Sequence, residues 1–369
     1  MHIAIDARTI QAGFAGDRIV LENLIPQLAR LPEVTQVTLY GDNRFGSENP
    51  LPRVDNCQQR LFTTRRGWLW TPVGLPRRLR ADGADVLHAP YLVPPVSPCP
   101  TVVAIHDLAY RILPELYPPT RSRLRSGLIT LSAHRARAVI TDSEASRRDL
   151  LRLMRLPAGK VHVVPLAQAE HFTPGDATEA QARVRAAFGV EPPIILTVGY
   201  SSPRKNVPLL LDAIAAAPSG PLREATVVVV GRPGMDSPDT LRDRFPGLTG
   251  RLVFTGWIGT DELVALYRAA SVFAFPSLYE GFGLPVLEAM ACGTPVVTSS
   301  TTSLPEVAGE AAVLVEPTDG AALAAALTAV LHDGALAGDL RARGLRRAAE
   351  FSWERTARQT FEVYRDALA

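Results

Sequence analysis

Short apolar runs alternate with helix-like segments along the whole chain, and this alternation is what most restricts its fold. The first half predicts strands at 2–5, 37–40, 86–88, 101–105, 138–141 and 161–164, and helices at 19–30, 120–136 and 143–155. The pattern then restarts, with strands at 194–198, 225–230, 251–255, 272–275, 295–298 and 312–314, and helices at 208–216, 260–269, 285–291, 304–307 and 320–331. Such alternation is typical of parallel sheets with crossover helices. We therefore expect an α/β fold with two doubly wound, Rossmann-like domains.

The length of 369 residues also favours two domains, because one ordinary core rarely grows so large. The boundary is expected between Pro165 and Pro192, where 172–176 has the composition of a linker. We expect an N-terminal domain at 1–175, a C-terminal domain at 176–352, and a last amphipathic helix at 353–369 that crosses back to the first domain. The domains would face each other across a cleft, with ligands at the carboxyl ends of the strands.

Composition narrows the class of protein. Hydrophobic residues make up 47% and charged residues 21%, as in globular proteins generally. Cys57, Cys99 and Cys292 fit neither a metal spacing nor a disulfide framework, which indicates a reducing compartment. No apolar run approaches the length of a membrane span, and no signal peptide is visible. We expect a cytoplasmic protein without a nucleic-acid partner.

The net charge of +2 conceals an asymmetry. Residues 1–167 hold 22 Lys and Arg against 14 Asp and Glu, whereas the remainder holds 17 against 23. The excess gathers at Arg65-Arg66, at 77–80 and at 121–125. Such a basic half could rest peripherally on the anionic inner face of the cell membrane, or meet an anionic acceptor. Solvated arginines in an arginine-rich protein are the alternative interpretation.

The run Tyr279-Glu280-Gly281-Phe282-Gly283-Leu284-Pro285-Val286-Leu287-Glu288 carries the strongest indication of function. It follows one predicted strand and opens a helix, so its turn would offer backbone N–H groups to an anion. Glu280 and Glu288 suit hydroxyl groups rather than phosphate, because a carboxylate only accepts hydrogen bonds. N–H groups for phosphate beside carboxylates for hydroxyls predict a nucleotide-sugar site. A capped helix with an exposed glutamate is the alternative.

Two further segments are predicted to contribute to this site. Arg204 and Lys205 follow the first strand of the second domain, where they could bind a pyrophosphate as a fork and as a point charge. Lys205 and Lys160 are the only lysines among 39 cationic residues. His106 ends an apolar strand of the first domain, so it is a candidate for substrate contact, although a lone histidine beside a strand is as often structural.

Missing motifs restrict the chemistry. The sequence contains no Asp-x-Asp pair, which commonly anchors a divalent cation on a nucleoside diphosphate. Charge on a leaving diphosphate would then fall to Arg204, Lys205 and the helix N-terminus near Leu284, and we expect neither a metal nor a cofactor. The sequence also lacks a P-loop motif, and no Gly-x-Gly-x-x-Gly follows its first strand.

These residues together give the chain a close resemblance to the retaining GT-B glycosyltransferases of family four over nearly its whole length. The segments 275–277, 280–283 and 288–297 resemble the family's E-x7-E signature. The resemblance implies that Glu288 holds the ribose hydroxyls and that Glu280 contacts the donor sugar. It implies that the N–H groups of Gly281, Phe282, Gly283 and Leu284 lie near the sugar and phosphates. Arg204 and Lys205 match the diphosphate-binding pair, and His106 matches the histidine against the donor sugar.

The finer pattern is similar to bacterial mannosyltransferases of polysaccharide assembly, on the segments 106–110, 203–206 and 303–309. This implies a mannose donor such as GDP-mannose, with UDP-sugars left open. One segment departs from the family, whose Gly-Ile-Gly-Arg-Tyr loop corresponds here to 13–19. Gly16 is retained as a candidate ligand-binding glycine, but the Gly-Arg-Tyr step is replaced by Gly16-Asp17-Arg18, where Arg18 could take the place of the missing arginine.

We therefore expect a metal-independent, retaining hexosyltransferase that acts on a nucleotide-sugar donor. The acceptor would be a hydroxyl of a glycan or a lipid-linked oligosaccharide, or else a soluble natural product. A nucleotide-sugar epimerase or a phosphorylase of the same fold is the enzymatic alternative. A degenerate carbohydrate-binding partner is the non-enzymatic one.

Overall fold

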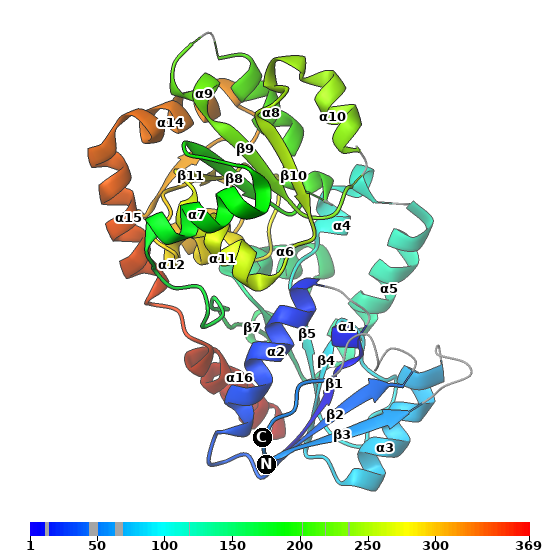
Figure 1. The fold of residues 1–369 in the computed structure, drawn as a ribbon. Coiled ribbons are helices and arrows are strands. Elements are labelled where there is room, and N and C mark those ends of the chain that lie inside the picture. The colour runs from blue at the N-terminus through cyan, green and yellow to red at the C-terminus, as the bar shows by residue number, and fades with distance from the viewer. Residues whose placement is uncertain are drawn as a thin grey trace. The chain divides into compact units, whose positions relative to one another are not determined.

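The computed structural model describes residues 1–11, 15–43, 51–62, 69–117, 119–200, 202–217, 219–234 and 237–369, without the side chains of 15 and 119–123. It divides into two compact units. Unit 1 consists of Met1–Leu166 together with Ser352–Ala369, and unit 2 is Ala167–Phe351. Each unit is built on its own parallel sheet (Figure 1).

The sheet of unit 1 has seven strands in the order β3-β2-β1-β4-β5-β6-β7, and all its pairs are parallel. Its strands are β1 (His2–Asp6), β2 (Gln36–Asp42), β3 (Cys57–Phe62), β4 (Val86–Pro90), β5 (Thr101–Ala104), β6 (Ala138–Thr141) and β7 (Val161–Val163). The chain order reverses between the neighbours β1 and β4. Such a reversal opens a crevice at the carboxyl ends of the strands, where doubly wound folds bind ligands.

The helices of unit 1 connect these strands, except the last one, which follows unit 2 in the chain (Figure 1). They are α1 (Arg8–Gln11), α2 (Ala15–Ala29), the π-helical η2 (Trp70–Gly74), α3 (Leu75–Asp82), α4 (Ala109–Ile112), η3 (Pro114–Leu116), α5 (Pro119–Arg135), α6 (Glu144–Met154), η4 (Ala158–Lys160) and α16 (Trp353–Leu368). Local chemistry sets their ends, as at Ser143, whose side chain accepts a hydrogen bond from the Ser146 N–H and caps α6 as predicted.

Unit 2 has a six-stranded parallel sheet in the order β10-β9-β8-β11-β12-β13. The strands are β8 (Ile194–Val198), β9 (Thr226–Val230), β10 (Leu252–Gly256), β11 (Val272–Phe275), β12 (Val296–Ser299) and β13 (Ala312–Val315). Here the order reverses between β8 and β11. Both strands are almost fully buried, which explains their continuous apolar runs.

The helices of unit 2 cover this sheet. They are α7 (Ala177–Phe188), η5 (Pro203–Lys205), α8 (Val207–Ala215), α9 (Pro221–Glu224), α10 (Pro238–Arg244), η6 (Pro246–Leu248), α11 (Thr260–Ala269), α12 (Leu284–Ala291), α13 (Leu304–Ala308), α14 (Gly320–His332) and α15 (Gly334–Ala348). Each unit has a core of its own, which includes Val227 and Leu323 in unit 2 and Leu87 and Val103 in unit 1. The predicted α/β class with two doubly wound sheets is confirmed.

The predicted helix at 353–369 is α16, which packs against α2 and the middle strands of unit 1 (Figure 1). The Thr356 hydroxyl donates to the Pro165 carbonyl at 2.7 Å, and Tyr364 Oη lies 2.8 Å from His88 Nδ1. Residues 172–176 contain neither helix nor strand. They belong to unit 2, where Phe172 is buried against the ring of Tyr267.

The described part of the chain contains no single helix long and apolar enough to cross a membrane. One pair of helical segments, 320–332 and 334–368, passes the test of length and composition together but is bent by 97°.

Candidate functional site

Arg204 and Lys205 lie at the carboxyl end of β8, in the short turn η5. Two residues with positive φ shape the approach, Gly199 at 96° and Asn206 at 60°. A Cβ on Gly199 would lie 2.9 Å from Lys205 Cε, so glycine leaves the space that the lysine side chain occupies. The Asn206 amide donates to the carbonyls of Pro276 and Pro317, at 3.1 and 2.7 Å, and ties this turn to two neighbouring loops.

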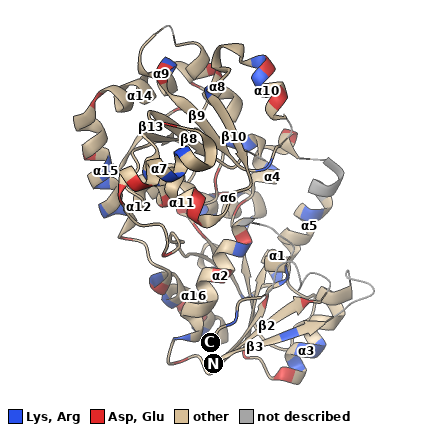
Figure 2. Ribbon diagram, viewed as in Figure 1, with Lys and Arg blue, Asp and Glu red and all other residues tan. Residues whose placement is uncertain are grey.

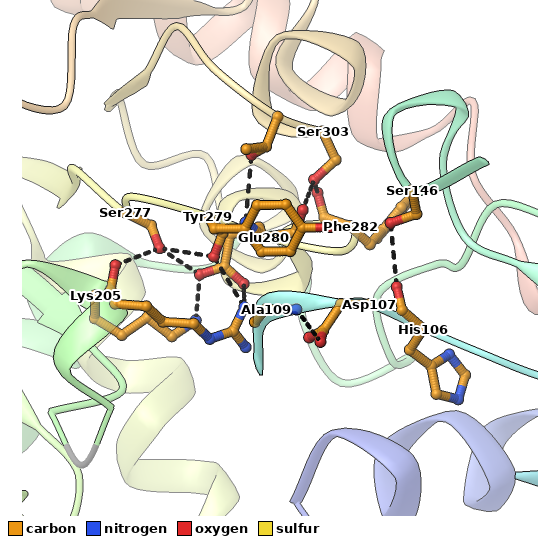
Figure 3. A network of polar contacts seen from close by, with 12 residues as sticks. His106, Asp107, Ala109, Ser146, Lys205, Ser277, Tyr279, Glu280, Phe282 and Ser303 are labelled. Atoms are coloured by element: carbon orange, nitrogen blue, oxygen red, sulfur yellow. Dashed lines mark hydrogen bonds and ion pairs between the residues drawn. The ribbon is translucent and has the colours of Figure 1, made fainter. Parts of the chain in front are cut away.

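Glu280 follows β11, the strand beside β8, so both segments reach the same edge of the sheet at the reversal of strand order. Lys205 Nζ donates to Glu280 Oε1 at 2.7 Å, and Ser277 Oγ donates to the same oxygen at 2.6 Å (Figure 3). Arg204 Nη1 lies 3.1 Å from Glu280 Oε2. The structure therefore joins three of the predicted residues in one ion-pair network, which we call the Glu280 network.

The Glu280 network is buried, with Glu280 4% and Lys205 9% exposed. Burial alone would raise the pKa of Glu280, but the charges of Arg204 and Lys205, with hydrogen bonds from Lys205 and Ser277, outweigh it and lower the pKa. Lys205 Nζ also lies 4.5 Å from the centroid of the Phe275 ring. Two cations and one carboxylate leave the network with a net positive charge, which favours an anionic ligand.

The turn from Gly281 to Leu284 enters α12 through Gly283, whose φ is 117°. A Cβ there would approach Leu304 Cδ2 to 2.8 Å, so both backbone angle and space require glycine. Ser303 Oγ donates to the carbonyls of Glu280 and Phe282, at 3.0 and 2.7 Å, and holds the turn in place (Figure 3). The Phe282 side chain is buried against Phe351, so the side chain is not available to a ligand.

Glu288 lies one turn inside α12 and is 6% exposed. Its Oε2 accepts a hydrogen bond from Tyr267 Oη at 3.0 Å. Burial raises the pKa of Glu288 to about 7, although the Tyr267 hydrogen bond and the charge of Lys205 act in the opposite direction. The two glutamates therefore differ, since Glu280 is held ionised and Glu288 is poised near neutral pH.

His106 belongs to unit 1, where it follows β5. Its Nδ1 lies 2.8 Å from Asp142 Oδ2, at the end of the neighbouring strand β6, and its Nε2 lies 3.9 Å from Asp17 Oδ1. Burial alone would lower the pKa of His106, but the charge and hydrogen bond of Asp142, followed by the charge of Asp17, raise it to about 9. The imidazole is therefore a mostly buried cation at neutral pH.

Sequence reasoning did not identify several of these contacts. Asp142 and Tyr267 were missed, and Asp17 was noted only as part of a departure from a family pattern. The sequence offered a signal for Asp142 as a site residue, because it directly follows a predicted strand, as His106 does. Tyr267 had none, because a tyrosine inside a predicted helix is usually a core residue.

In the glycine-rich segment 13–19, Gly13 and Phe14 lie outside the described residues. Gly16 is exposed in the first turn of α2, and a Cβ there would meet nothing within 4 Å. Its ligand-binding role stays a prediction. Arg18 donates to Glu22 Oε1 at 2.8 Å along the same helix. His106 lies in one unit and the Glu280 network in the other, and their convergence on one cleft also stays a prediction.

Comparison with known proteins identifies the family. Residues 16–167 match the family described as Glycosyltransferase Family 4, and residues 192–333 match Glycosyl transferases group 1. The O-antigen chain mannosyltransferase B of Escherichia coli is 33% identical over 359 residues, which cover 93% of each chain. The chain belongs to the family 4 glycosyltransferases.

Two other matches concern the sequence and the fold, respectively. The serotype-specific mannosyltransferase WbdA of Escherichia coli is 31% identical over 70% of this chain, which spans only 32% of WbdA. The sucrose-phosphate synthase of Thermosynechococcus elongatus superposes with a TM-score of 0.78 over 99% of this chain and 98% of its own, at 23% identity. The second match concerns the fold alone, which is that of the GT-B glycosyltransferases.

Proposed function

We propose that this glycosyltransferase moves mannose from GDP-mannose to a hydroxyl group of a glycan or lipid-linked acceptor, with retention of configuration and without a metal ion. The observation that carries the proposal is the Glu280 network. In this network Arg204 and Lys205 lie at the reversal of strand order in unit 2, and the network as a whole has a net positive charge. Doubly wound sheets bind nucleotides at this position, and two cations there suit a diphosphate.

The proposed reaction is attack on the face of the sugar from which the diphosphate leaves. The bond between the anomeric carbon and the phosphate oxygen breaks, and a bond from the same carbon to the acceptor oxygen forms. The proton of the acceptor hydroxyl passes to the departing phosphate oxygen. Arg204 and Lys205 would stabilise the charge that develops on the diphosphate, as a metal ion does elsewhere.

Each remaining site residue receives a role within this proposal. Glu288 would accept hydrogen bonds from the ribose hydroxyls and Glu280 from the donor sugar, since both side chains are carboxylates. The N–H groups of the turn at Gly281–Leu284 would lie near the phosphates. His106 would contact the donor sugar once the nucleotide-sugar is bound. Support for mannose comes from the mannosyltransferase relative at 33% identity.

The experiment compares Lys205→Ala and Glu288→Ala with Lys160→Ala, the matched control at the only other lysine. Lys160 Nζ donates to the His134 carbonyl and belongs to unit 1, whereas the Glu280 network belongs to unit 2. We expect the first two variants to lose at least about a hundredfold in kcat/KM with GDP-mannose, a loss within the range known for one electrostatic group. The control should keep its turnover.

Unchanged transfer by both site variants would refute the site assignment. A melting-temperature screen with GDP, GDP-mannose, UDP and UDP-glucose tests the donor separately, because a ligand that binds the folded state raises apparent stability. A rise in melting temperature with the uridine nucleotides alone would indicate that the donor is a UDP-sugar and not GDP-mannose. Conversion of the donor to another nucleotide-sugar without an acceptor would favour an epimerase, and binding without turnover would favour a carbohydrate-binding protein.

We also propose that unit 1 contacts an anionic membrane from the cytoplasmic side. Helix α5 contains arginines and no acidic residue (Figure 2). Leu124, Leu128 and Leu131 recur at helical spacing on α5 and are 70%, 45% and 45% exposed. Apolar side chains beside arginines, with no acid among them, suit an anionic lipid surface. Arg65 and Arg66 lie outside the described residues, as do the side chains of Arg121 and Arg123.

A further inference from the structure

A buried tyrosine hydroxyl contacts one of the two glutamates of the candidate donor site. Tyr267 lies in α11 and is completely buried. Its Oη donates to Glu288 Oε2, in the next helix α12, at 3.0 Å. Most side-chain hydrogen bonds go to backbone or water, whereas this one goes to a carboxylate that has a role in the proposed function. A fully buried side chain of unit 2 thus holds one oxygen of Glu288.

Three contacts fix the position of this hydroxyl. The ring of Tyr267 packs edge-on with Phe172, at 5.7 Å between the ring centroids, and with Phe273 of β11, at 5.4 Å. The hydroxyl of Thr294, shortly after the end of α12, donates to the Tyr267 carbonyl at 2.6 Å. A tyrosine that is held at its ring and at its backbone has little freedom to follow a moving partner. Tyr267 Oη is therefore a fixed point that orients the Glu288 carboxylate.

The second oxygen of Glu288 has no such partner. A carboxylate can accept about four hydrogen bonds through its two oxygens. Within the part of the chain that the structure describes, Tyr267 is the single hydrogen-bond donor to this side chain, so Oε1 receives none. Glu288 is nevertheless only 6% exposed, and the large majority of buried side-chain polar atoms are hydrogen-bonded. Oε1 is therefore available to a hydrogen-bond donor from a ligand.

The surroundings of Glu288 favour an uncharged donor group on that ligand. Lys205 acts on Glu288 electrostatically, but its ammonium donates to Glu280 Oε1 at 2.7 Å. An ionised phosphate has no proton to donate to a carboxylate, and the two negative charges repel each other. Ribose hydroxyls are neutral donors, and their hydrogen bonds to an ionised carboxylate are strong. A ribose therefore suits Glu288 Oε1 better than a phosphate does.

We infer that Tyr267 is a positioning residue of the donor site, which holds Oε2 of Glu288 so that Oε1 accepts hydrogen bonds from the ribose hydroxyls of the nucleotide. This inference rests on the proposed function, in which Glu288 binds the ribose. Tyr267 itself touches no substrate and acts through Glu288 alone. Loss of its hydroxyl should therefore weaken nucleotide binding only where both the ribose hydroxyls and the Glu288 carboxylate are present.

The ionisation of Glu288 gives a readout beyond binding. Three titratable groups interact with it, namely Tyr267 of α11, Lys205 of η5 and Cys292 at the end of α12. Burial raises the pKa of Glu288 to about 7, and the Tyr267 hydrogen bond and the Lys205 charge oppose this rise. Burial also raises the pKa values of Tyr267 and Cys292, so both groups are neutral near pH 7. Removal of the Tyr267 hydroxyl should therefore raise the pKa of Glu288 further.

The test compares Tyr267→Phe, which keeps the ring and removes the hydroxyl, with Tyr364→Phe. The control removes a buried, hydrogen-bonded tyrosine hydroxyl in the same way, but from unit 1. Titration calorimetry with GDP at a pH of about 7 should show a Kd about tenfold higher in Tyr267→Phe than in the wild type. The loss of a hydrogen bond to a charged group predicts an effect of this size. The Kd of Tyr364→Phe should stay within about twofold of the wild-type value.

Two further readouts separate positioning from packing. With 2′,3′-dideoxy-GDP, which lacks both ribose hydroxyls, Tyr267→Phe should bind within about twofold of the wild type, because the contact that Tyr267 supports is absent. A general loss of packing would instead weaken the binding of GDP and of its dideoxy analogue equally. The effect of Tyr267→Phe on the Kd for GDP should also decrease towards a pH of about 9, where Glu288 is ionised in both proteins.

A double variant tests whether Tyr267 acts through Glu288. In a Glu288→Ala background, Tyr267→Phe should change the Kd for GDP by less than about twofold, since the partner of the hydroxyl is already removed. Removal of both partners also avoids an unpaired buried carboxylate. This comparison therefore decides the inference if Tyr267→Phe alone does not fold.

An unchanged Kd for GDP in Tyr267→Phe would overturn the inference, and so would a further tenfold rise in the Glu288→Ala background. Failure of the proposed function gives a different result, in which the wild type binds a nucleotide but transfers no mannose. The nucleotide measurements then still decide the role of Tyr267, with UDP and 2′,3′-dideoxy-UDP if only uridine nucleotides bind. A wild type that binds neither GDP nor UDP would overturn both.

Discussion

At the scale of single residues, two glutamates of one signature have opposite electrostatic surroundings. Glu280 forms ion pairs with Lys205 and Arg204, and these lower the pKa of its carboxyl. Glu288 accepts a hydrogen bond from the neutral Tyr267 hydroxyl, and burial raises its pKa to about 7. Sequence reasoning placed both carboxylates in one site but did not predict this difference. The difference depends on which side chains the fold brings into contact with each carboxylate.

The raised pKa of Glu288 predicts a pH-dependent affinity for the donor. An ionised carboxylate accepts hydrogen bonds from hydroxyls better than a protonated one, so the donor Kd should increase as the pH falls below about 7. The increase should approach tenfold per pH unit at the acid end. In Glu288→Gln this dependence should disappear. Titration calorimetry with GDP-mannose from pH 5.5 to 8.5, a range of about 1.5 units on either side, checks it.

The titration of Glu288 should also change the stability of the folded protein. The folded-state pKa of Glu288 lies above its ordinary value of 4.5, so the folded protein binds the proton more tightly than the unfolded chain. The contribution of Glu288 to the free energy of unfolding therefore decreases as the pH rises from about 4.5 to about 7. Glu310→Gln, at an exposed glutamate, is the control, and its donor Kd and its stability should depend on pH as those of the wild type do. A flat affinity profile in the wild type would contradict the assignment.

At the scale of secondary-structure elements, the buried strands were predictable and the polar edge was not. β8 and β11 have continuous apolar sequences because both faces of a parallel sheet are covered. β3 has the sequence Cys57-Gln58-Gln59-Arg60-Leu61-Phe62, lies at the edge of its sheet and is largely exposed. A strand without a buried face has no apolar pattern to read, and β3 was missed. α7, α10 and α15 were missed as well, although Asp176, Ser237 and Asp333 cap them.

Helix α5 carries the prediction at this scale. The double variant Leu124→Ser/Leu128→Ser should reduce binding to phosphatidylcholine vesicles that contain phosphatidylglycerol by more than about tenfold, since burial of each leucine contributes about 1.5–3 kcal/mol. Trp257→Ser is the control, because Trp257 is 69% exposed but belongs to unit 2. Vesicle co-sedimentation measures the bound fraction. Equal binding by the double variant, or no binding by the wild type, would refute the membrane contact.

At the scale of the whole molecule, the chain completes its first unit with its last helix. α16 returns to unit 1 after the whole of unit 2, and Tyr364 contacts His88 across 276 residues of sequence. His88 is 3% exposed, and burial lowers its pKa to about 3, so the imidazole is neutral. The hydrogen bond between these two buried groups therefore links α16 to β4 without any charge.

This contact predicts a local effect. Tyr364→Phe should reduce the stability of unit 1 by about 1–3 kcal/mol, because it leaves a buried ring nitrogen without its partner. Hydrogen exchange of the folded protein should then show faster exchange in β4, β5 and α16. Unit 2 is the internal control and should exchange at the wild-type rate. Uniform acceleration over both units, or none in unit 1, would contradict the separate role of α16.

The sequence by itself determined the alternation of strands and helices, the two doubly wound sheets and the segments that carry Glu280, Glu288, Arg204 and Lys205. These features are readable because burial and backbone geometry impose local patterns on neighbouring residues. Only the tertiary structure decided the partners, since Lys205 and Glu280 are 75 residues apart and Asp142 is 36 residues from His106. Strand order sets which strand ends become neighbours, and the charge on each site residue follows from the neighbours it meets there.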